Sequence, residues 1–170
     1  SQPSLVLTML RCLEVEKSHK VLEVGTGSGW NAGLLAFRAD DDRLVHSMDL
    51  QPDLVEMARD HLRAAGFPDV NLRAGDGGYG WPDRAPFDRI IATVGCPDVP
   101  PAWREQLAEG GIVLIPLKTR GVGDPLLRLK KRHNCLEGQF VGYSGFMTLQ
   151  GEFWTNAQDW LFSPWDPRIE

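Results

Sequence analysis

The stretch VLEVGTGSGW at residues 21–30 constrains the fold of this chain more than any other part of the sequence. Its apolar residues Val21, Leu22 and Val24 predict a strand that is buried on both faces. The alternating glycines that follow let the backbone turn sharply and lie against a ligand. A helix beginning near Trp30 would direct free backbone N–H groups toward that ligand. The stretch therefore predicts a strand, a turn and a helix that hold a nucleotide-like ligand.

Hydrophobic periodicity predicts that strands and helices alternate along the rest of the chain. We expect strands near residues 44–48, 70–74, 87–93 and 112–115, and helices over residues 5–13, 31–37, 52–65 and 101–108. Two further strands, at 126–129 and 140–149, have the pattern of an antiparallel pair at a sheet edge. The expected fold class is α/β, with a doubly wound, mostly parallel Rossmann-like sheet and helices on both faces.

The composition is that of one ordinary globular domain, since 42% of the 170 residues are hydrophobic and 24% are charged. We place this domain at residues 1–151 and a tail rich in Trp and Pro at residues 152–170. The chain opens at Ser1 without a methionine, which leaves open a missing or cleaved N-terminal segment. The sequence does not predict the oligomeric state.

The net charge and the cysteine content indicate which partners this chain can bind and which cellular compartment suits it. A net charge of −5 argues against a protein that binds nucleic acid by neutralising phosphates. The three widely spaced cysteines indicate neither a disulfide framework nor a zinc site, and they favour a reducing compartment. The sequence also lacks an apolar run long enough to span a membrane. We therefore expect a cytoplasmic protein without nucleic-acid or membrane partners.

Acidic residues near the predicted turns identify the ligand more closely than the glycines do. Asp49 ends the second strand, where a carboxylate can accept hydrogen bonds from both hydroxyls of a ribose, and Asp76 follows the third strand. Glu23 would repel a pyrophosphate but attract an ammonium or sulfonium group. Residues 27–32 also satisfy a loose dinucleotide fingerprint, so NAD stays open as an alternative. The three acids favour S-adenosylmethionine.

Several motifs follow one another in a specific order: Ser1-Gln2-Pro3, residues 21–30, Gly75-Asp76-Gly77, residues 86–93 and residues 107–116. Together they resemble the protein-L-isoaspartate (D-aspartate) O-methyltransferase family, and the resemblance covers the chain as far as Glu152. It implies an enzyme that transfers a methyl group from S-adenosylmethionine to the carboxylate of an L-isoaspartyl or aspartyl residue in a protein or peptide. The resulting ester can cyclise to a succinimide, which is the chemistry of isoaspartate repair.

The resemblance also implies roles for individual residues. Glu23 and the glycine turn would surround the methionine end of the cofactor, while Asp49 would bind its ribose and Asp76 its adenine amino group. Ser1 corresponds to a substrate-side serine of the family, whose hydroxyl faces the isoaspartyl carboxylate and positions it. The cofactor-binding residues expected in full are Glu23, Gly25, Thr26, Gly27, Ser28, Gly29, Asp49, Leu50, Gly75, Asp76 and Gly77. A metal is not expected.

Departures from the family pattern fall on the acceptor side. Ser4 stands where the family usually carries a larger aromatic residue or a histidine, and Val94-Gly95-Cys96 replaces a small, alanine-rich loop. They leave open a peptide-tailoring methyltransferase that esterifies an aspartate in a modified peptide. Outside this chemistry, the alternatives are an NAD-dependent oxidoreductase and a non-catalytic nucleoside-binding module.

Overall fold

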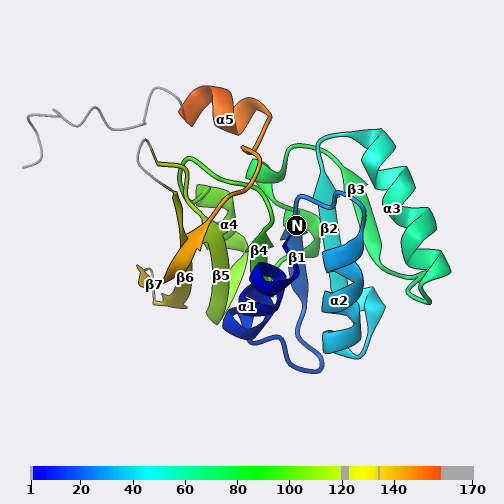
Figure 1. Cartoon of the computed structure of the whole chain (residues 1–170). Coiled ribbons are helices and arrows are strands. Elements are labelled where there is room, and N and C mark those ends of the chain that lie inside the picture. Colours follow the sequence, from blue (N-terminus) through cyan, green and yellow to red (C-terminus); the bar gives the residue numbers. More distant parts are fainter. Residues whose placement is uncertain (1, 120–122, 134, 158–170) are drawn as a thin grey trace, which may run out of the picture.

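The computed structural model describes residues 2–119, 123–133 and 135–157, which form a sheet covered by helices (Figure 1). The helices are α1 (Pro3–Leu13), α2 (Trp30–Ala39), α3 (Pro52–Ala64), α4 (Pro101–Gln106) and α5 (Glu152–Ala157). The strands are β1 (Val21–Val24), β2 (Val45–Asp49), β3 (Asn71–Ala74), β4 (Phe87–Ala92), β5 (Leu107–Pro116), β6 (Asp124–Arg132) and β7 (Cys135–Ser144). Short 3-10 turns lie at Asp42–Leu44, Gly77–Tyr79 and Pro82–Arg84.

The sheet has the strand order β3-β2-β1-β4-β5-β6-β7. The strands from β3 to β5 are parallel, and β6 and β7 continue the sheet as an antiparallel pair, which confirms the predicted fold class. From β1 the chain winds first toward β2 and β3, and then to the other side toward β4 and β5. The carboxyl ends of these strands therefore meet at a topological switch point beside β1, where open α/β sheets bind their ligands.

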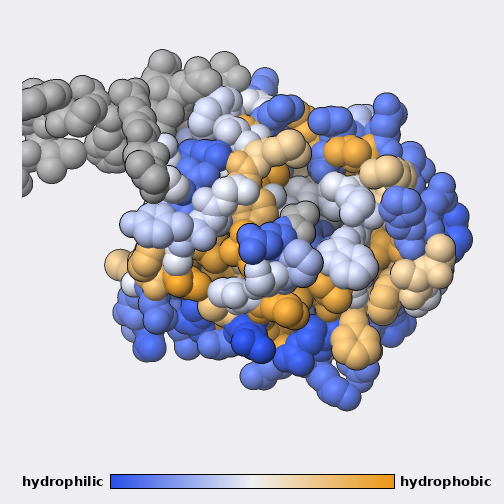
Figure 2. Space-filling model, viewed as in Figure 1, coloured by the Kyte–Doolittle hydropathy of each residue, from blue (hydrophilic) through white to orange (hydrophobic). Residues whose placement is uncertain are grey.

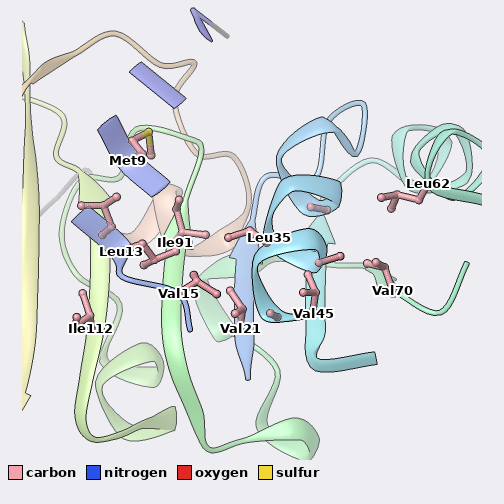
Figure 3. Packing of buried hydrophobic residues seen from close by; sticks show 14 of the residues in the cluster. Met9, Leu13, Val15, Val21, Leu35, Val45, Leu62, Val70, Ile91 and Ile112 are labelled. Carbon is pink, nitrogen blue, oxygen red and sulfur yellow. The ribbon is translucent and has the colours of Figure 1, made fainter. Parts of the chain in front are cut away.

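One apolar cluster fills the space between the sheet and the helices α1 and α2. In Figure 3, Leu13 of α1 lies beside Ile91 of β4, and Leu35 of α2 lies near Val21 of β1. All four of these side chains are fully buried. Val21 packs in this cluster, whereas Leu22 and Val24 pack on the opposite face, so the apolar residues of β1 are buried on both faces of the sheet.

A second apolar cluster covers the opposite face of the sheet, where Leu22 of β1 and Ile90 of β4 lie with Trp103 of α4. The Trp103 indole Nε1 donates a hydrogen bond of 2.8 Å to the carbonyl oxygen of Gly77. A fully buried side chain therefore fixes the turn that follows β3, at the edge of the sheet where a ligand is expected.

The boundary between α4 and β5 differs from the prediction of a helix over residues 101–108. Helix α4 ends at Gln106, and Leu107 already pairs with Phe87 of β4. The register then shifts before Arg89 pairs with Ile112, so Gly110 and its neighbours form an irregular start of the strand. Gly110 has φ of +76°, which a glycine adopts without strain. Gly110 therefore lies within β5, and the helix ends two residues before its predicted end at residue 108.

The prediction of one strand over residues 140–149 is also corrected by the structure. Strand β7 begins at Cys135 and ends at Ser144, because β6 and β7 form a long hairpin. Residues 145–150, which we call the return segment, leave the hairpin and run back to the loop after β4. There Gly95 and Thr148 form an isolated parallel bridge.

Helix α5 follows the return segment, in a part of the sequence for which we predicted no secondary structure. It contacts the turn after β3, where Phe153 packs over Gly78 and Tyr79 donates a hydrogen bond of 2.9 Å to Glu152. The remainder of the predicted Trp-rich tail, residues 158–170, lies outside the described residues. Within the described part of the chain, we find no helix long and apolar enough to cross a membrane.

Candidate cofactor and acceptor site

A cavity of about 570 Å³ opens at the carboxyl ends of the central strands, a size typical of small-molecule sites. One side of it is formed by residues 24–28 at the end of β1 and residues 48–51 at the end of β2. Residues 93–94 after β4, residues 146–150 of the return segment and one face of α1 complete the wall. The cavity therefore lies at the switch point that the strand order defines.

The glycine turn is shaped for close approach to a ligand. Gly25 has φ of +102°, and a Cβ there would lie 2.5 Å from the Thr93 hydroxyl oxygen. The Thr93 hydroxyl donates to the Gly25 carbonyl at 2.5 Å, so the end of β4 holds the turn after β1. Gly27 has φ of +52° and open space where a Cβ would stand. Gly27 also lines the cavity, and its positive φ is a conformation that glycine adopts without strain.

Asp49 joins the glycine turn to the end of β2. Its Oδ2 accepts a hydrogen bond of 2.9 Å from the Gly27 N–H, and its Oδ1 accepts one of 3.2 Å from the Gln51 N–H. Each carboxylate oxygen can accept a second hydrogen bond. Because Asp49 also lines the cavity, its remaining acceptor positions can face a ligand there, and its contact with the two hydroxyls of a ribose stays a prediction.

Glu23 lies beneath the cavity in a fully buried polar network. Its Oε1 accepts a hydrogen bond of 2.8 Å from Asn31 Nδ2, and its Oε2 accepts one of 2.6 Å from Ser47 Oγ. The Thr26 hydroxyl lies 2.6 Å from the same Ser47 oxygen. Asn31 and Thr26 both line the cavity, so these hydrogen bonds connect the Glu23 carboxyl to the cavity lining.

Burial raises the pKa of Glu23 from 4.5 to about 7, and the hydrogen bonds from Ser47 and Asn31 offset only part of that rise. The negative charge of Asp49 raises it further. A positively charged group in the cavity would favour the ionised form of Glu23, whereas an anionic pyrophosphate would disfavour it. The electrostatics of the cavity floor therefore suit a cationic ligand.

Asp76 stands at the end of β3 and caps the turn that follows. Its Oδ1 accepts a hydrogen bond of 2.8 Å from the Gly78 N–H, and its Oδ2 accepts one of 3.3 Å from the Phe153 N–H at the start of α5. The carboxylate therefore links the turn after β3 to α5. Its predicted contact with an adenine amino group would use the remaining acceptor positions of these oxygens.

The structure brings most of the predicted cofactor residues to one wall. Those lining the cavity are Gly25, Thr26, Gly27, Ser28, Asp49, Leu50 and Gly77. Glu23, Gly29, Gly75 and Asp76 lie next to that lining: Gly29 precedes α2 and packs against α3, and the Gly75 N–H donates to the Asp49 carbonyl. Ser1, the predicted acceptor-side residue, lies outside the described residues.

Sequence reasoning missed the groups on the far side of the cavity. Val6 and Met9 come from α1, Thr93 from the end of β4 and Leu149 from the return segment. Figure 2 shows hydrophobic side chains gathered on the face that carries α1. Thr93 had a usable signal, because it ends a predicted strand beside β1. The return segment had none, since only the β6–β7 hairpin brings it back.

The Thr93 hydroxyl gives a first prediction. Thr93→Val keeps the shape of the side chain but removes its hydrogen bond to the Gly25 carbonyl. We expect the free energy of unfolding to fall by about 1 kcal/mol, as for one lost hydrogen bond. S-adenosylhomocysteine should bind only about threefold more weakly. Denaturant unfolding and calorimetry measure the two effects. Thr8→Val, which removes an exposed bond to Ser4, is the matched control, and an effect no larger than this control would contradict the prediction.

The strand order and the cavity at the switch point place this chain in the class of Rossmann-like methyltransferases. A family model described as protein-L-isoaspartate(D-aspartate) O-methyltransferase matches residues 1–152. The chain belongs to this family. The resemblance drawn from the sequence motifs is thereby confirmed, and so is the predicted extent of the match.

Curated relatives are similar to most of this chain but are longer than it. The protein-L-isoaspartate O-methyltransferase of Myxococcus xanthus is 43% identical over 131 residues, which are 77% of this chain and 60% of that protein. The Pyrococcus abyssi protein of the same name is 40% identical over 154 residues, which are 90% of this chain and 70% of that protein. The chain therefore spans about 60 to 70% of the length of these curated relatives.

Solved structures with different printed names share the fold of this chain. A structure named protein-L-isoaspartate O-methyltransferase has a TM-score of 0.87 and 32% identity, covering 94% of this chain and 50% of that one. An RNA methyltransferase from Salinibacter ruber has a TM-score of 0.62 at 22% identity, with 78% and 94% covered. Because both share the fold, the acceptor has to be argued from the residues around the cavity.

Proposed function

We propose that this chain is an S-adenosylmethionine-dependent carboxyl O-methyltransferase that acts on L-isoaspartyl residues of proteins or peptides. The family match over residues 1–152 carries the proposal, and we assign the activity to a domain of residues 1–151. The product would be a methyl ester that can cyclise to a succinimide. Three unpaired cysteines favour a reducing cytoplasm as the compartment.

The cavity fits this cofactor in volume, backbone shape and charge. Asp49 would hold the ribose, the backbone of Gly25 and Gly27 would lie along the amino-acid portion, and Glu23 with Asn31 would face its positive charge. The cofactor supplies a methyl group on a sulfonium, which is its own leaving group. Asp76 remains the proposed contact of the adenine amino group, through the acceptor positions that Gly78 and Phe153 leave open.

The proposed reaction asks the protein to align groups rather than to move a proton. An aspartyl-type carboxylate with a pKa of about 4 is already ionised at neutral pH, so it needs no general base. The chain would bind the acceptor against Val6, Met9 and the return segment, and hold its carboxylate oxygen in line with the methyl group. These apolar side chains also exclude water, which strengthens the electrostatic interactions inside the cavity.

A methyl-transfer assay with paired peptides tests the proposal. The 170-residue chain would be incubated with S-adenosylmethionine carrying a labelled methyl group and with an isoaspartyl peptide or its normal aspartyl twin. We expect a base-labile methyl ester on the isoaspartyl peptide and none on the twin. Equal labelling of both would favour the peptide-tailoring alternative. Cofactor binding without labelling of either peptide would contradict the proposed isoaspartyl activity and favour a dedicated modified-peptide substrate or a non-catalytic nucleoside-binding module.

A further inference from the structure

A partly buried ion pair contacts the return segment and has no part in the functions proposed so far. The Lys118 Nζ lies 2.6 Å from Asp124 Oδ2, and the two side chains are only 22% and 11% exposed. The same ammonium donates a hydrogen bond of 2.7 Å to the Phe146 carbonyl. Lys118 therefore connects three parts of the chain: the residues after β5, the first residue of β6 and the return segment.

Gly95 leaves room for this connection. A Cβ at Gly95 would overlap the methylene carbons of Lys118, so the lysine side chain crosses the loop after β4 at the one residue that has no side chain there. The Gly95 N–H donates to the Met147 carbonyl at 2.8 Å, and the Leu149 N–H donates to the Gly95 carbonyl at 2.8 Å. The return segment is thus held by its own backbone to Gly95 and by the Lys118 ammonium at Phe146.

The contact between Lys118 and the return segment lies on the acceptor side of the cavity rather than on the cofactor side. The return segment joins the loop after β4, whereas Asp49 ends β2, and β1 lies between these two strands. Under the proposed function the nucleoside occupies the β2 side of β1. The return segment then forms the wall that faces the acceptor. Lys118 itself is outside the set of described residues that line the cavity.

We propose that Lys118 is a positioning residue for the acceptor: its ion pair with Asp124 and its bond to Phe146 hold the return segment in the position that binds the isoaspartyl peptide. This inference rests on the proposed function for the identity of the acceptor. The placement of the segment by Lys118 rests on the contacts alone. A lysine that is mostly buried needs both partners, because an unpaired ammonium there would be costly to desolvate. The three groups therefore adopt one arrangement together.

Two substitutions break the contact in different ways. Lys118→Met keeps most of the side-chain volume but removes the ammonium, whereas Gly95→Ala keeps the ammonium and displaces the side chain that carries it. Lys118→Arg keeps a charged donor and serves as the conservative rescue. Lys17→Met is the matched control, because Lys17 also pairs with an aspartate, Asp40, but on the exposed surface.

For Lys118→Met and Gly95→Ala we expect KM for an isoaspartyl peptide to rise about tenfold, the equivalent of one lost hydrogen bond to a charged group. The kcat and the affinity for S-adenosylhomocysteine should change by less than about twofold. Amide exchange at Leu149 should accelerate by about tenfold in both variants. Lys118→Arg and Lys17→Met should resemble the unaltered protein in all of these measurements.

Equal losses of peptide and S-adenosylhomocysteine affinity would overturn the proposal, since they would show a general structural role. Unchanged exchange at Leu149 would also overturn it, because the return segment would then not depend on Lys118. If the unaltered protein methylates no isoaspartyl peptide, the proposed function fails. The exchange measurement and S-adenosylhomocysteine binding still report whether Lys118 holds the segment, so the two failures are distinguishable.

Discussion

Asp49→Ala should weaken S-adenosylhomocysteine binding by about 100-fold, because two hydrogen bonds from ribose hydroxyls to a charged acceptor contribute about 3 kcal/mol together. The substitution also removes the acceptors of the Gly27 and Gln51 N–H groups, so the glycine turn loses its tie to β2. The core clusters on both faces of the sheet are untouched, and the protein should still fold. Isothermal titration calorimetry with S-adenosylhomocysteine measures the expected loss.

Two further variants separate ribose recognition from support of the turn. Asp49→Asn keeps one acceptor, the oxygen of the side-chain amide, and it should therefore retain part of the affinity that Asp49→Ala loses. Asp53→Ala removes an exposed acid in the first turn of α3, close to the site but outside the cavity lining, and it should bind normally. Unchanged affinity in Asp49→Ala would leave Asp49 with a turn role only.

Glu23→Gln should alter how stability depends on pH. The folded protein raises the pKa of Glu23 from 4.5 to about 7, so folding favours the protonated carboxyl. Its stabilising contribution is complete below pH 4.5 and is lost as the pH rises to about 7. The loss over that window is about 3 kcal/mol, at 1.36 kcal/mol for each pH unit. A glutamine carries no such dependence.

The hydrogen-bond network can accommodate glutamine. Its oxygen can accept from Asn31, and its amide can donate to Ser47 if the Ser47 hydroxyl turns to donate to Thr26. Between pH 4.5 and pH 8, the unfolding free energy of the variant should therefore rise by about 3 kcal/mol relative to that of the unaltered protein. Denaturant unfolding at several pH values measures this shift. A difference that does not vary with pH would refute it.

The half of the site that follows β1 and β2 could be predicted from local sequence. Gly25 and Gly27 adopt positive φ angles, and Asp49 lies within hydrogen-bonding distance of the turn, because each comes at the end of a strand whose apolar pattern is clear. Parallel strands place their carboxyl ends at one edge of a sheet. We could therefore predict that these residues lie close together from the strand pattern alone.

The opposite half of the site depends on long-range pairing and could not be predicted in the same way. The β6–β7 hairpin is longer than its apolar pattern indicated, and this length decides where the return segment begins. Lys118 reads as an ordinary surface lysine until Gly95 and Asp124 are placed beside it. Likewise, Asp76 gives no sign in the sequence that Phe153 would share its carboxylate.

The cavity takes one wall from α1 near the start of the chain and another from the return segment near residue 150. During synthesis, the turn after β1 and the end of β2 can form long before the β6–β7 hairpin has left the ribosome. A nascent chain that ends after β5 would thus carry the groups proposed to hold the nucleoside but lack the wall proposed to face the peptide. The order of synthesis would delay the proposed methyl transfer until the return segment has emerged.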